Sequence, residues 1–509
     1  MNQQDSTSLC DVKSLIEFQA SRRGEQVFLI DPSKRRKITY RDLLNLVQHI
    51  ASNVRSLGAR PGDNIAYALS NGSDCAIVIL ALLYGGYRAT AVNLVAGPGT
   101  IAHVLEHSQS KFVITQPAHV QLLDQSLGSK TDLLPKLYPN QLLSRPVNGF
   151  ANDNSKTISE SDDGLLMYTS GTTGKPKGVV LTHGNLVAGG NNAAIAHELS
   201  PQDRALCVLP LYHINGLCVT LMGPLVSGGS VVLPEKFSAS SFWHQVGADN
   251  CSWFSVVPTQ ISYLLHEKNS KNAMDMNLEK VRFGRSASAP LSPDVQTAFE
   301  KRFGIPIIET MGLTETAAQI LSNPLPPGTR KTGSPGIPVG NEVIIADKNQ
   351  KELKPGQEGE ILVRGPNVMR MYLKDAAATK SSLTPDRWFR TGDLGRMDED
   401  GYFFVTGRLR ELIIKGGENI APREIDEALY AHGDVIEAAA FACPCENYGQ
   451  TIQAAVKVNA RSQVSENELL EFCRHRLGQV KTPDRIHFLQ ELPKGPSGKI
   501  QRSKIIDIL

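Results

Sequence analysis

The 509-residue chain lacks an excess of charge of either sign, since 53 Lys and Arg face 51 Asp and Glu, for a formal net charge of +2. Proteins that bind nucleic acid or anionic membranes usually carry a basic surplus, so we expect neither partner. Cysteine is also scarce, because eight scattered residues are too few for a disulfide scaffold. Cys443 and Cys445 have no second pair nearby, which argues against a zinc site.

Long apolar runs are missing as well. The first residues are polar and contain no apolar segment of the kind found in secretory signals. We find no run of about 18 apolar residues of the kind that spans a membrane. The last three residues do not form a peroxisomal signal. We therefore expect a cytoplasmic protein with no membrane partner.

What is present is an alternation of strand and helix patterns. A chain of this length should hold more than one domain. Apolar strand patterns at 63–69 and 111–115 alternate with helix patterns at 74–84 and 101–107, which predicts layered α/β structure. Residues 118–162 are rich in Asn, Ser and Asp, and we interpret them as an irregular surface connection.

The last hundred residues have a pattern of their own. Two strand patterns lie between helix patterns at 422–430 and 466–477, and together they suffice for a small α+β domain. The predicted organisation is a large amino-terminal domain of layered α/β subdomains over 1–409. A small α+β domain follows over 410–509.

The most informative stretch is YTSGTTGKPKG at 168–178, which lies between two apolar, strand-like runs. Its glycines let backbone N–H groups turn toward a guest, its hydroxyls add donors, and its lysines add positive charge. That combination suits a polyphosphate, and the alternative is an ordinary hairpin loop. Pro176 follows Lys175, so this is not the common G-x-x-x-x-G-K-[ST] nucleotide loop.

Five weaker motifs follow in order. His213 lies among apolar residues, where a histidine is by default an ordinary core or surface residue with no catalytic role. The small residues at 284–290 can lie flat against a ring or form a tight turn. The segment 309–315 ends in a carboxylate, which suits a hard cation such as Mg²⁺. Asp393 can accept from two adjacent hydroxyls, as on a ribose, or be a turn residue. Lys499 lies in a glycine-rich segment that otherwise reads as an exposed basic turn.

These motifs, with the Gly-Arg at 407–408, occur in an order that resembles the AMP-forming acyl-CoA synthetases of the adenylate-forming superfamily over most of the chain. Residues 209–340 resemble the oxalate–CoA ligase branch through KFSASSFW, RSASA and SNPLPP. Three positions depart from the pattern. Asn215 and Ala318 stand where that branch tends to have histidines, and Met311 stands where the superfamily usually has a tyrosine against adenine.

The resemblance implies ATP, Mg²⁺ and CoA, and a mobile small domain that rotates about a hinge at Arg410. It implies catalytic roles for Lys499, Thr314, Glu315 and His213, with Glu315 also holding the metal. CoA would pass beside Lys415, Gly416 and Gly417. The residues implied in ATP binding are Thr169, Ser170, Gly171, Thr172, Thr173, Gly174, Lys175, Lys177, Ala287, Ser288, Ala289, Glu309, Thr310, Met311, Thr314, Asp393, Arg408 and Lys499.

The implied activity is an ATP-dependent acid–thiol ligase that forms an acyl-AMP and transfers the acyl group to CoA, releasing AMP and pyrophosphate. Arg285 is expected in the acyl pocket, and a guanidinium suits oxyanions. We therefore expect a small carboxylic acid with a second polar or anionic group, such as a dicarboxylate or a sulfonated acid. Arg285 could instead form a structural ion pair. The residues expected to line the acyl pocket are His213, Asn215, Trp253, Val257, Arg285 and Ser286.

Other functions stay open at the level of sequence. The chain could load the phosphopantetheine of a carrier protein, activate a medium-length or aromatic acid, or bind a nucleotide without turnover. We expect a monomer or a homodimer.

Overall fold

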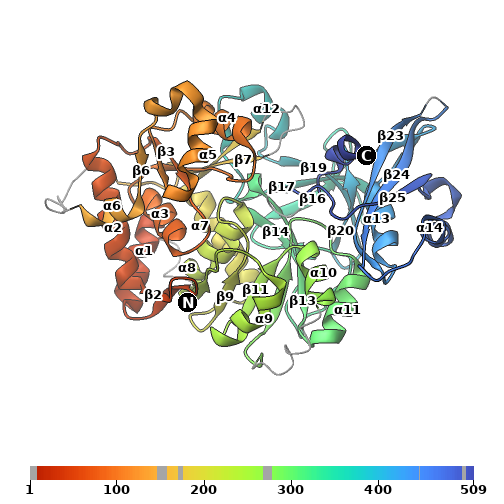
Figure 1. Ribbon diagram of the computed structural model, residues 1–509, viewed down its shortest axis with the longest axis horizontal. Coiled ribbons are helices and arrows are strands. Elements are labelled where there is room, and N and C mark those ends of the chain that lie inside the picture. The colour runs from red at the N-terminus through yellow and green to blue at the C-terminus, as the bar shows by residue number, and fades with distance from the viewer. Residues whose placement is uncertain (1–8, 146–156, 170–175, 268–277, 446, 496–499) are drawn as a thin grey trace.

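The computed structural model describes residues 9–145, 157–169, 176–267, 278–445, 447–495 and 500–509. A large amino-terminal domain contains sheets of nine, seven and four strands, and a smaller carboxyl-terminal domain contains a sheet of five. Figure 1 shows the large domain in red to light blue and the small domain in darker blue on the right. The predicted fold class, a large α/β domain followed by a small α+β domain, is confirmed.

The seven-stranded sheet carries the predicted phosphate loop. Its order is β18-β8-β7-β4-β3-β5-β6, with bounds Met371–Tyr372, Lys177–Thr182, Asp163–Thr169, Arg88–Ala91, Asn64–Ala68, Phe112–Thr115 and Lys136–Leu137. The strands from β7 to β6 are parallel, and β7 and β8 form an antiparallel hairpin. The four strand and helix patterns predicted between residues 63 and 115 are confirmed as β3, α3 (Ser73–Tyr84), α4 (Pro98–Ser108) and β5.

The prediction of an irregular connection over 118–162 is wrong for its first part. This part contains α5 (Pro117–Leu127), the 3₁₀ helix η1 (Gly128–Leu133), β6 and α6 (Pro139–Ser144). Both α-helices begin with a proline, which suits the first helical position because no intrahelical partner is needed there. Leu123 and Leu127, one turn apart, are buried in a core cluster. Their spacing was the helical signal among polar neighbours.

The nine-stranded sheet runs β15-β14-β13-β12-β11-β9-β10-β1-β2. Its bounds are Ile337–Pro338, Ala318–Ser322, Ile307–Leu313, Phe283–Ser286, Trp253–Val256, Arg204–Cys207, Ser230–Val232, Val27–Asp31 and Arg36–Thr39. The strands from β13 to β1 are parallel. The carboxyl ends of β11, β12 and β13 therefore lie together, which is where ligands bind in sheets of this kind.

Helices cover both faces of this sheet. On one face α9 (Ala239–Ala248), α10 (Pro258–His266) and α11 (Pro293–Phe303) pack on Phe254 and Val256. On the other face lie α7 (His183–Ala196), the π-helix η2 (Asn215–Met222) and α8 (Gly223–Ser227). α1 (Val12–Arg23) and α2 (Tyr40–Ser56) join this layer.

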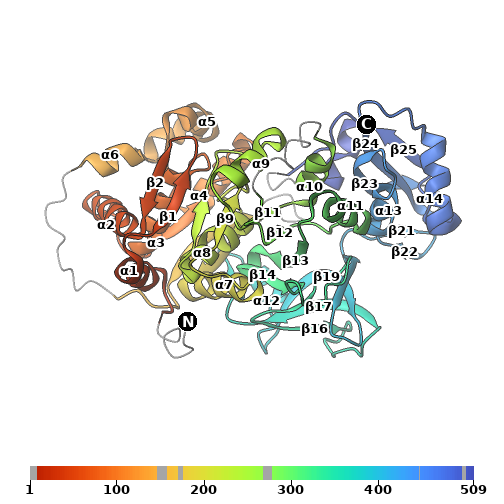
Figure 2. The same ribbon diagram turned by 90° about the horizontal axis from the view of Figure 1, so that it is seen from below.

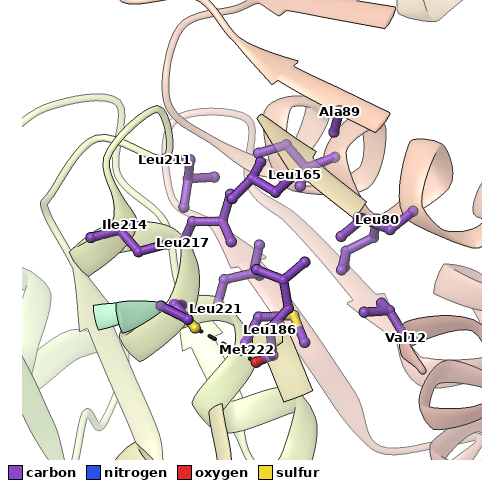
Figure 3. Packing of buried hydrophobic residues seen from close by; sticks show 14 of the residues in the cluster. Val12, Leu80, Ala89, Leu165, Leu186, Leu211, Ile214, Leu217, Leu221 and Met222 are labelled. Carbon is purple, nitrogen blue, oxygen red and sulfur yellow. Dashed lines mark hydrogen bonds between the residues drawn. The ribbon is translucent and has the colours of Figure 1, made fainter. Parts of the chain in front are cut away.

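The layer around α7 and η2 holds the two larger sheets together. Figure 3 shows Leu165 of β7 and Leu80 of α3 packed near Leu186 of α7 and Leu217 of η2. These four residues are 0% exposed, so water is excluded between the sheets. One continuous apolar core therefore fixes the phosphate-loop sheet relative to the nine-stranded sheet.

The four-stranded sheet lies at the lower edge of the molecule in Figure 2. Its order is β16-β17-β19-β20, with bounds Glu342–Ala346, Glu358–Arg364, Phe389–Met397 and Phe403–Arg408, and α12 (Ala376–Ser382) precedes β19. Asp393 lies within β19, directly opposite Arg408 of β20. The alternative that Asp393 is a turn residue is therefore wrong.

The small domain has its own sheet and core. Its strands run β22-β21-β24-β23, with β25 beside β24, and their bounds are Glu418–Ile420, Ile413–Lys415, Gly449–Val458, Val435–Cys445 and Arg485–Phe488. α13 (Pro422–Tyr430) and α14 (Glu466–Lys481) supply Ile425, Leu429 and Leu469 to a core cluster of small-domain residues. Arg410 lies between β20 and β21, where the hinge is predicted.

Among the described residues, none of the helices is both long and apolar enough to cross a lipid bilayer.

Candidate active site

A pocket opens where the carboxyl ends of the central strands meet the four-stranded sheet and the small domain. Its cavity volume is about 120 Å³, which is below the ~300–1,000 Å³ typical of small-molecule sites, and the pocket is partly open to solvent. Seven residues of the predicted ATP site line it, namely Ser288, Ala289, Glu309, Thr310, Met311, Asp393 and Arg408. The predicted ATP residue Ala287 is buried beside them, and its N–H donates to the Val256 carbonyl.

A carboxylate and a guanidinium face each other in this pocket. Arg408 Nε donates to Asp393 Oδ1 over 2.5 Å, and Asp393 is 4% exposed. Asp393 raises the pKa of the Arg408 guanidinium above its ordinary value, so the arginine keeps its proton. The aspartate oxygens can accept the two hydroxyls of a ribose while the arginine balances their charge.

Glu309 is a second carboxyl group in the pocket. Burial raises its pKa to about 7, although the nearby Arg423 and the N–H of Leu291 oppose that effect. Its Oε2 atom has no hydrogen-bond partner among the residues that the structure describes. A buried acceptor without a partner is costly, and a donor group on a bound base would satisfy it.

Glu315, the predicted metal ligand, lies in a short 3₁₀ helix, η4 (Thr314–Thr316). Tyr372 Oη donates to its Oε1 over 2.8 Å, and the Lys177 ammonium lies 5.1 Å from the centre of the Tyr372 ring. Burial raises the pKa of Glu315, which a nearby cation would oppose. The predicted catalytic residue Thr314 starts the same helix, and Thr169 pairs with Lys177 across the hairpin.

These residues fit a magnesium ion that arrives with ATP. No group of three or more His, Cys, Asp or Glu side chains within the described ranges could hold a metal unaided. Mg²⁺ commonly takes one or two protein carboxylates, with phosphates and water completing its coordination. Glu315 supplies such a carboxylate, with an aromatic hydroxyl to orient it.

Beside the pocket lined by Glu309 and Asp393 lies a buried polar network centred on Arg285. Arg285 Nη1 donates to Asn215 Oδ1 (2.8 Å) and to Ser255 Oγ (3.1 Å), and Nε donates to Gln319 Oε1 (3.2 Å). Asn215 Nδ2 in turn donates to Ser288 Oγ (3.2 Å), which lines the nucleotide pocket. One amide side chain therefore separates Arg285 from the nucleotide site.

The alternative that Arg285 forms a structural ion pair is wrong for the described part of the chain, where its partners are all neutral. Arg285 is 2% exposed, and burial lowers its pKa to about 9, so it remains a cation at neutral pH. The hydrogen bonds that Arg285 makes to described residues come from Nε and Nη1, and none of them comes from Nη2. A buried cation without a counter-anion is unfavourable, and an anionic ligand would relieve it.

The other predicted acyl-pocket residues differ in position. Burial lowers the pKa of His213 to about 4, so its ring is neutral, and its Nε2 has no partner among the described residues. Trp253 is fully buried and stacks on Phe283 with ring centres 5.6 Å apart, and Val257 lies between the end of β11 and the start of α10. Ser286 follows Arg285 in β12, so its side chain points to the opposite face of the sheet.

Several predicted residues lie outside the described ranges. These are Ser170, Gly171, Thr172, Thr173, Gly174, Lys175 and Lys499. The segment around Lys499 is bracketed by described neighbours, because Lys494 and Ile500 form an antiparallel bridge and Arg502 lines the nucleotide pocket.

The predicted CoA residues belong to the turn that joins β21 and β22. Lys415 pairs with Asp484 of the small domain (3.2 Å), while Gly416 and Gly417 adopt left-handed backbone angles with φ of 59° and 90°. Both glycines are exposed.

Several groups of the site carry no signal in the sequence. Ser255 and Gln319 hold Arg285, Tyr372 orients Glu315, and Glu411 and Arg423 join the pocket lining. Each is an ordinary polar residue in sequence, and only long-range contacts bring it to the site.

Comparison with known families decides the assignment. The profile described as "AMP-binding enzyme" matches residues 16–373, and the one described as "AMP-binding enzyme C-terminal domain" matches residues 424–499. The chain belongs to the AMP-binding enzyme family. It is an AMP-forming acyl-CoA synthetase of the oxalate–CoA ligase-like branch, and such enzymes use ATP, Mg²⁺ and CoA.

Two relatives and one solved structure illustrate the similarity. The chain is 43% identical over 498 residues to a sulfoacetate–CoA ligase from Cupriavidus necator, covering 97% of both chains. It is 35% identical to an oxalate–CoA ligase from Arabidopsis thaliana, covering 91% of this chain and 92% of the other. The fold matches ATP-bound MatB from Rhodopseudomonas palustris with a TM-score of 0.87 and 26% identity, covering 98% and 99% of the chains. The apo form of MatB gives 0.77.

Proposed function

We propose that this enzyme activates a short carboxylic acid that carries a sulfonate group, with sulfoacetate as the type substrate. The observation that carries the proposal is the buried Arg285 cation, whose described partners are all neutral. An anion on the substrate would supply the missing counter-charge and accept from Nη2. The 43% identity to a sulfoacetate–CoA ligase supports the same class of acid.

A sulfonate suits this network better than a second carboxylate does. It has three oxygens in a tetrahedral arrangement, so it can accept from Arg285 Nη2 while other oxygens face neighbouring donors such as the Gln319 amide. Gln319 Nε2 is buried and has no partner in the described part of the chain. Asn215 and Ala318 stand where the oxalate branch tends to have histidines, which favours an acid other than oxalate.

The nucleotide is proposed to bind in the neighbouring pocket. Adenine would lie between Met311 and the 288–290 segment, and a thioether is polarisable enough to contact a flat ring. Asp393 would accept the ribose hydroxyls with Arg408 beside it. Thr310 and Thr314 would approach the α-phosphate. Glu315 would hold the magnesium ion, which neutralises charge on the phosphates when it is bound.

In the first step the substrate carboxylate attacks the α-phosphorus of ATP, and pyrophosphate leaves. Like charges oppose this approach, so the residues contribute mainly position and positive charge. Lys499 would bridge the carboxylate and the α-phosphate, while Lys175 and Lys177 stabilise the departing pyrophosphate. His213, neutral and beside the acyl pocket, would border the reacting carboxylate.

In the second step the CoA thiolate attacks the acyl carbon, forming a thioester and expelling AMP. The small domain would rotate about Arg410 between the steps, removing Lys499 and bringing Lys415, Gly416 and Gly417 to the site. Arg423 and Arg502 line the nucleotide pocket, while Lys415 pairs inside the small domain. This orientation of the small domain suits the first step. The structure also matches ATP-bound MatB with a higher TM-score than it matches apo MatB, which supports the same orientation.

A panel of acids tests the substrate. Sulfoacetate, oxalate, malonate, propionate and a long-chain fatty acid are each incubated with ATP, Mg²⁺ and CoA, and AMP and thioester are measured together. The proposal expects the highest kcat/KM for sulfoacetate, with equal amounts of AMP and thioester. A preference for propionate or the fatty acid would refute it, and a preference for oxalate or malonate would move the assignment to dicarboxylates.

Two further properties belong to this proposal. Because ATP and CoA are its co-substrates, we expect the enzyme to act in the cytoplasm. We expect a monomer or a homodimer, which light scattering after size-exclusion chromatography measures.

A further inference from the structure

Tyr263 of α10 is a residue of the large domain that contacts three charged side chains of the small domain. Its hydroxyl donates to Glu437 Oε1 and accepts from Lys494 Nζ over 2.7 Å. The ammonium groups of Lys457 and Lys494 each lie 5.3 Å from the centre of its ring. The tyrosine is therefore recognised by the small domain through both its hydroxyl and its ring.

The partners of Tyr263 are already paired with one another. Lys494 Nζ lies 2.6 Å from Glu437 Oε1, and Glu437 is 0% exposed. Glu437 and Lys457 are also opposite each other on the neighbouring strands β23 and β24. Burial and Glu437 raise the pKa of the Tyr263 hydroxyl above its ordinary value, so it stays protonated and can donate.

The position of this contact links it to the chemistry. α10 begins at Pro258, directly after Val257 of the predicted acyl pocket. Lys494 pairs with Ile500 in an antiparallel bridge, so it marks the base of the segment that contains Lys499. Tyr263 thus connects the helix that leaves the acyl pocket with the base of the segment that carries the catalytic lysine.

Two other contacts between described residues of the two domains lack these features. Arg476 and Asp294 approach only to 3.8 Å, and their side chains are 47% and 57% exposed. Arg423 bonds to the backbone carbonyls of Val405 and Gly333, beside the predicted hinge. Tyr263 instead combines two hydrogen bonds with the paired, buried Glu437 and Lys494.

We propose that Tyr263 is a positioning residue, whose hydroxyl holds Lys494 and Glu437 so that the small domain adopts the orientation for acyl-adenylate formation. The inference rests on the proposed two-step function. The contact is suited to release, because the large domain contributes a neutral hydroxyl to it. When the domains separate, Glu437 and Lys494 keep each other as partners, and no charge is left unpaired.

The test measures the two half-reactions of Tyr263→Phe separately, with the acid that the wild type uses best. ATP–pyrophosphate exchange reports adenylation, and thioester formation from supplied acyl-AMP and CoA reports the second step. Tyr263→Phe should lower adenylation about tenfold and leave thioester formation unchanged or faster. A contact with a purely structural role would not divide the two rates.

Tyr84→Phe is a matched control inside the large domain. The Tyr84 hydroxyl donates to Glu17 (2.6 Å) and accepts from Gln48 (3.0 Å), and Lys13 lies 5.4 Å from its ring. The chemical change is therefore the same, but no domain contact is lost. Both half-reactions of this variant should match the wild type.

The outcomes separate this inference from the proposed function. A wild type that catalyses both halves, with Tyr263→Phe impaired only in adenylation, supports the inference. If Tyr263→Phe impairs both halves equally, or neither, the inference is overturned while the proposed function stands. A wild type without exchange activity for any acid overturns the proposed function and the inference together.

Discussion

Replacing Arg285 by methionine is the sharpest test of the proposed substrate. Methionine keeps an unbranched chain of similar reach but removes the charge and every donor of the guanidinium. The free enzyme loses three hydrogen bonds to neutral groups, and it also loses a buried cation without a described counter-anion. These two effects on folding stability oppose each other. Substrate preference is therefore the informative measurement.

The expected loss follows from the donors that Arg285 still offers. A hydrogen bond to a charged group contributes about 1.5–3 kcal/mol. Two such bonds from Nη2 to a sulfonate contribute at least about 3 kcal/mol, which corresponds to roughly 100-fold because each 1.4 kcal/mol is tenfold. The value of kcat/KM for sulfoacetate should fall by that factor. The value for propionate, which lacks the second anion, should change little.

The assay compares kcat/KM for sulfoacetate and propionate in the wild type and in Arg285→Met, following release of AMP. Arg282→Met is the matched control, since Arg282 precedes it by three residues and pairs with Asp203 (2.7 Å) away from the nucleotide pocket. It should leave the ratio of the two kcat/KM values unchanged. An equal fall for both acids in Arg285→Met would show that the arginine supports the site without reading the second anion.

Three further substitutions test other parts of the site. Glu309→Gln should remove a pH dependence of folding stability. The pKa of Glu309 is about 7 in the folded protein and 4.5 in an ordinary glutamate. The free energy of unfolding of the ligand-free wild type should therefore fall by about 3 kcal/mol as the pH rises from 4.5 to above 7. Urea unfolding of both proteins at pH 5 and pH 8 measures this. An equal change in the free energy of unfolding between the two pH values in the wild type and in Glu309→Gln contradicts it. Tyr372→Phe removes the donor to Glu315 and should raise the Mg²⁺ concentration for half-maximal activity several-fold, with the KM for the acid as the unaffected control. Lys499→Ala should abolish acyl-adenylate formation and spare thioester formation from supplied acyl-AMP; equal loss of both half-reactions would show that the two steps share this lysine.

Local patterns predicted most of the fold and part of the site. The alternation around β3 and α3 was legible because both are continuous apolar runs, and their lengths of 5 and 12 residues distinguish a strand from a helix. The motifs at 309–315 and at Asp393 could be matched to a nucleotide site because their residue types suit one chemistry. The helices α5 and α6 were missed because polar residues surround their few buried leucines.

The remaining site residues depend on contacts between distant parts of the chain. Gln319 bonds to Arg285 across 34 positions, Tyr372 bonds to Glu315 across 57, and Tyr263 bonds to Glu437 across 174. Nothing near any of these residues in the sequence marks it as a partner. The sequence also could not predict that the described partners of Arg285 are neutral, because an ion pair and an uncompensated cation have the same local sequence.

Asn215 has a consequence for how this enzyme can change during evolution. Its amide oxygen accepts from Arg285 and its amide nitrogen donates to Ser288, so one side chain would serve both the proposed acid site and the proposed nucleotide site. A substitution there alters the KM values for the acid and for ATP together. Ser255 bonds to Asn215 and Arg285 and is not one of the described residues that line the neighbouring pocket, so changes there can be selected for a new acid alone. Drift toward other substrates therefore has an accessible route through Ser255 and a constrained one through Asn215.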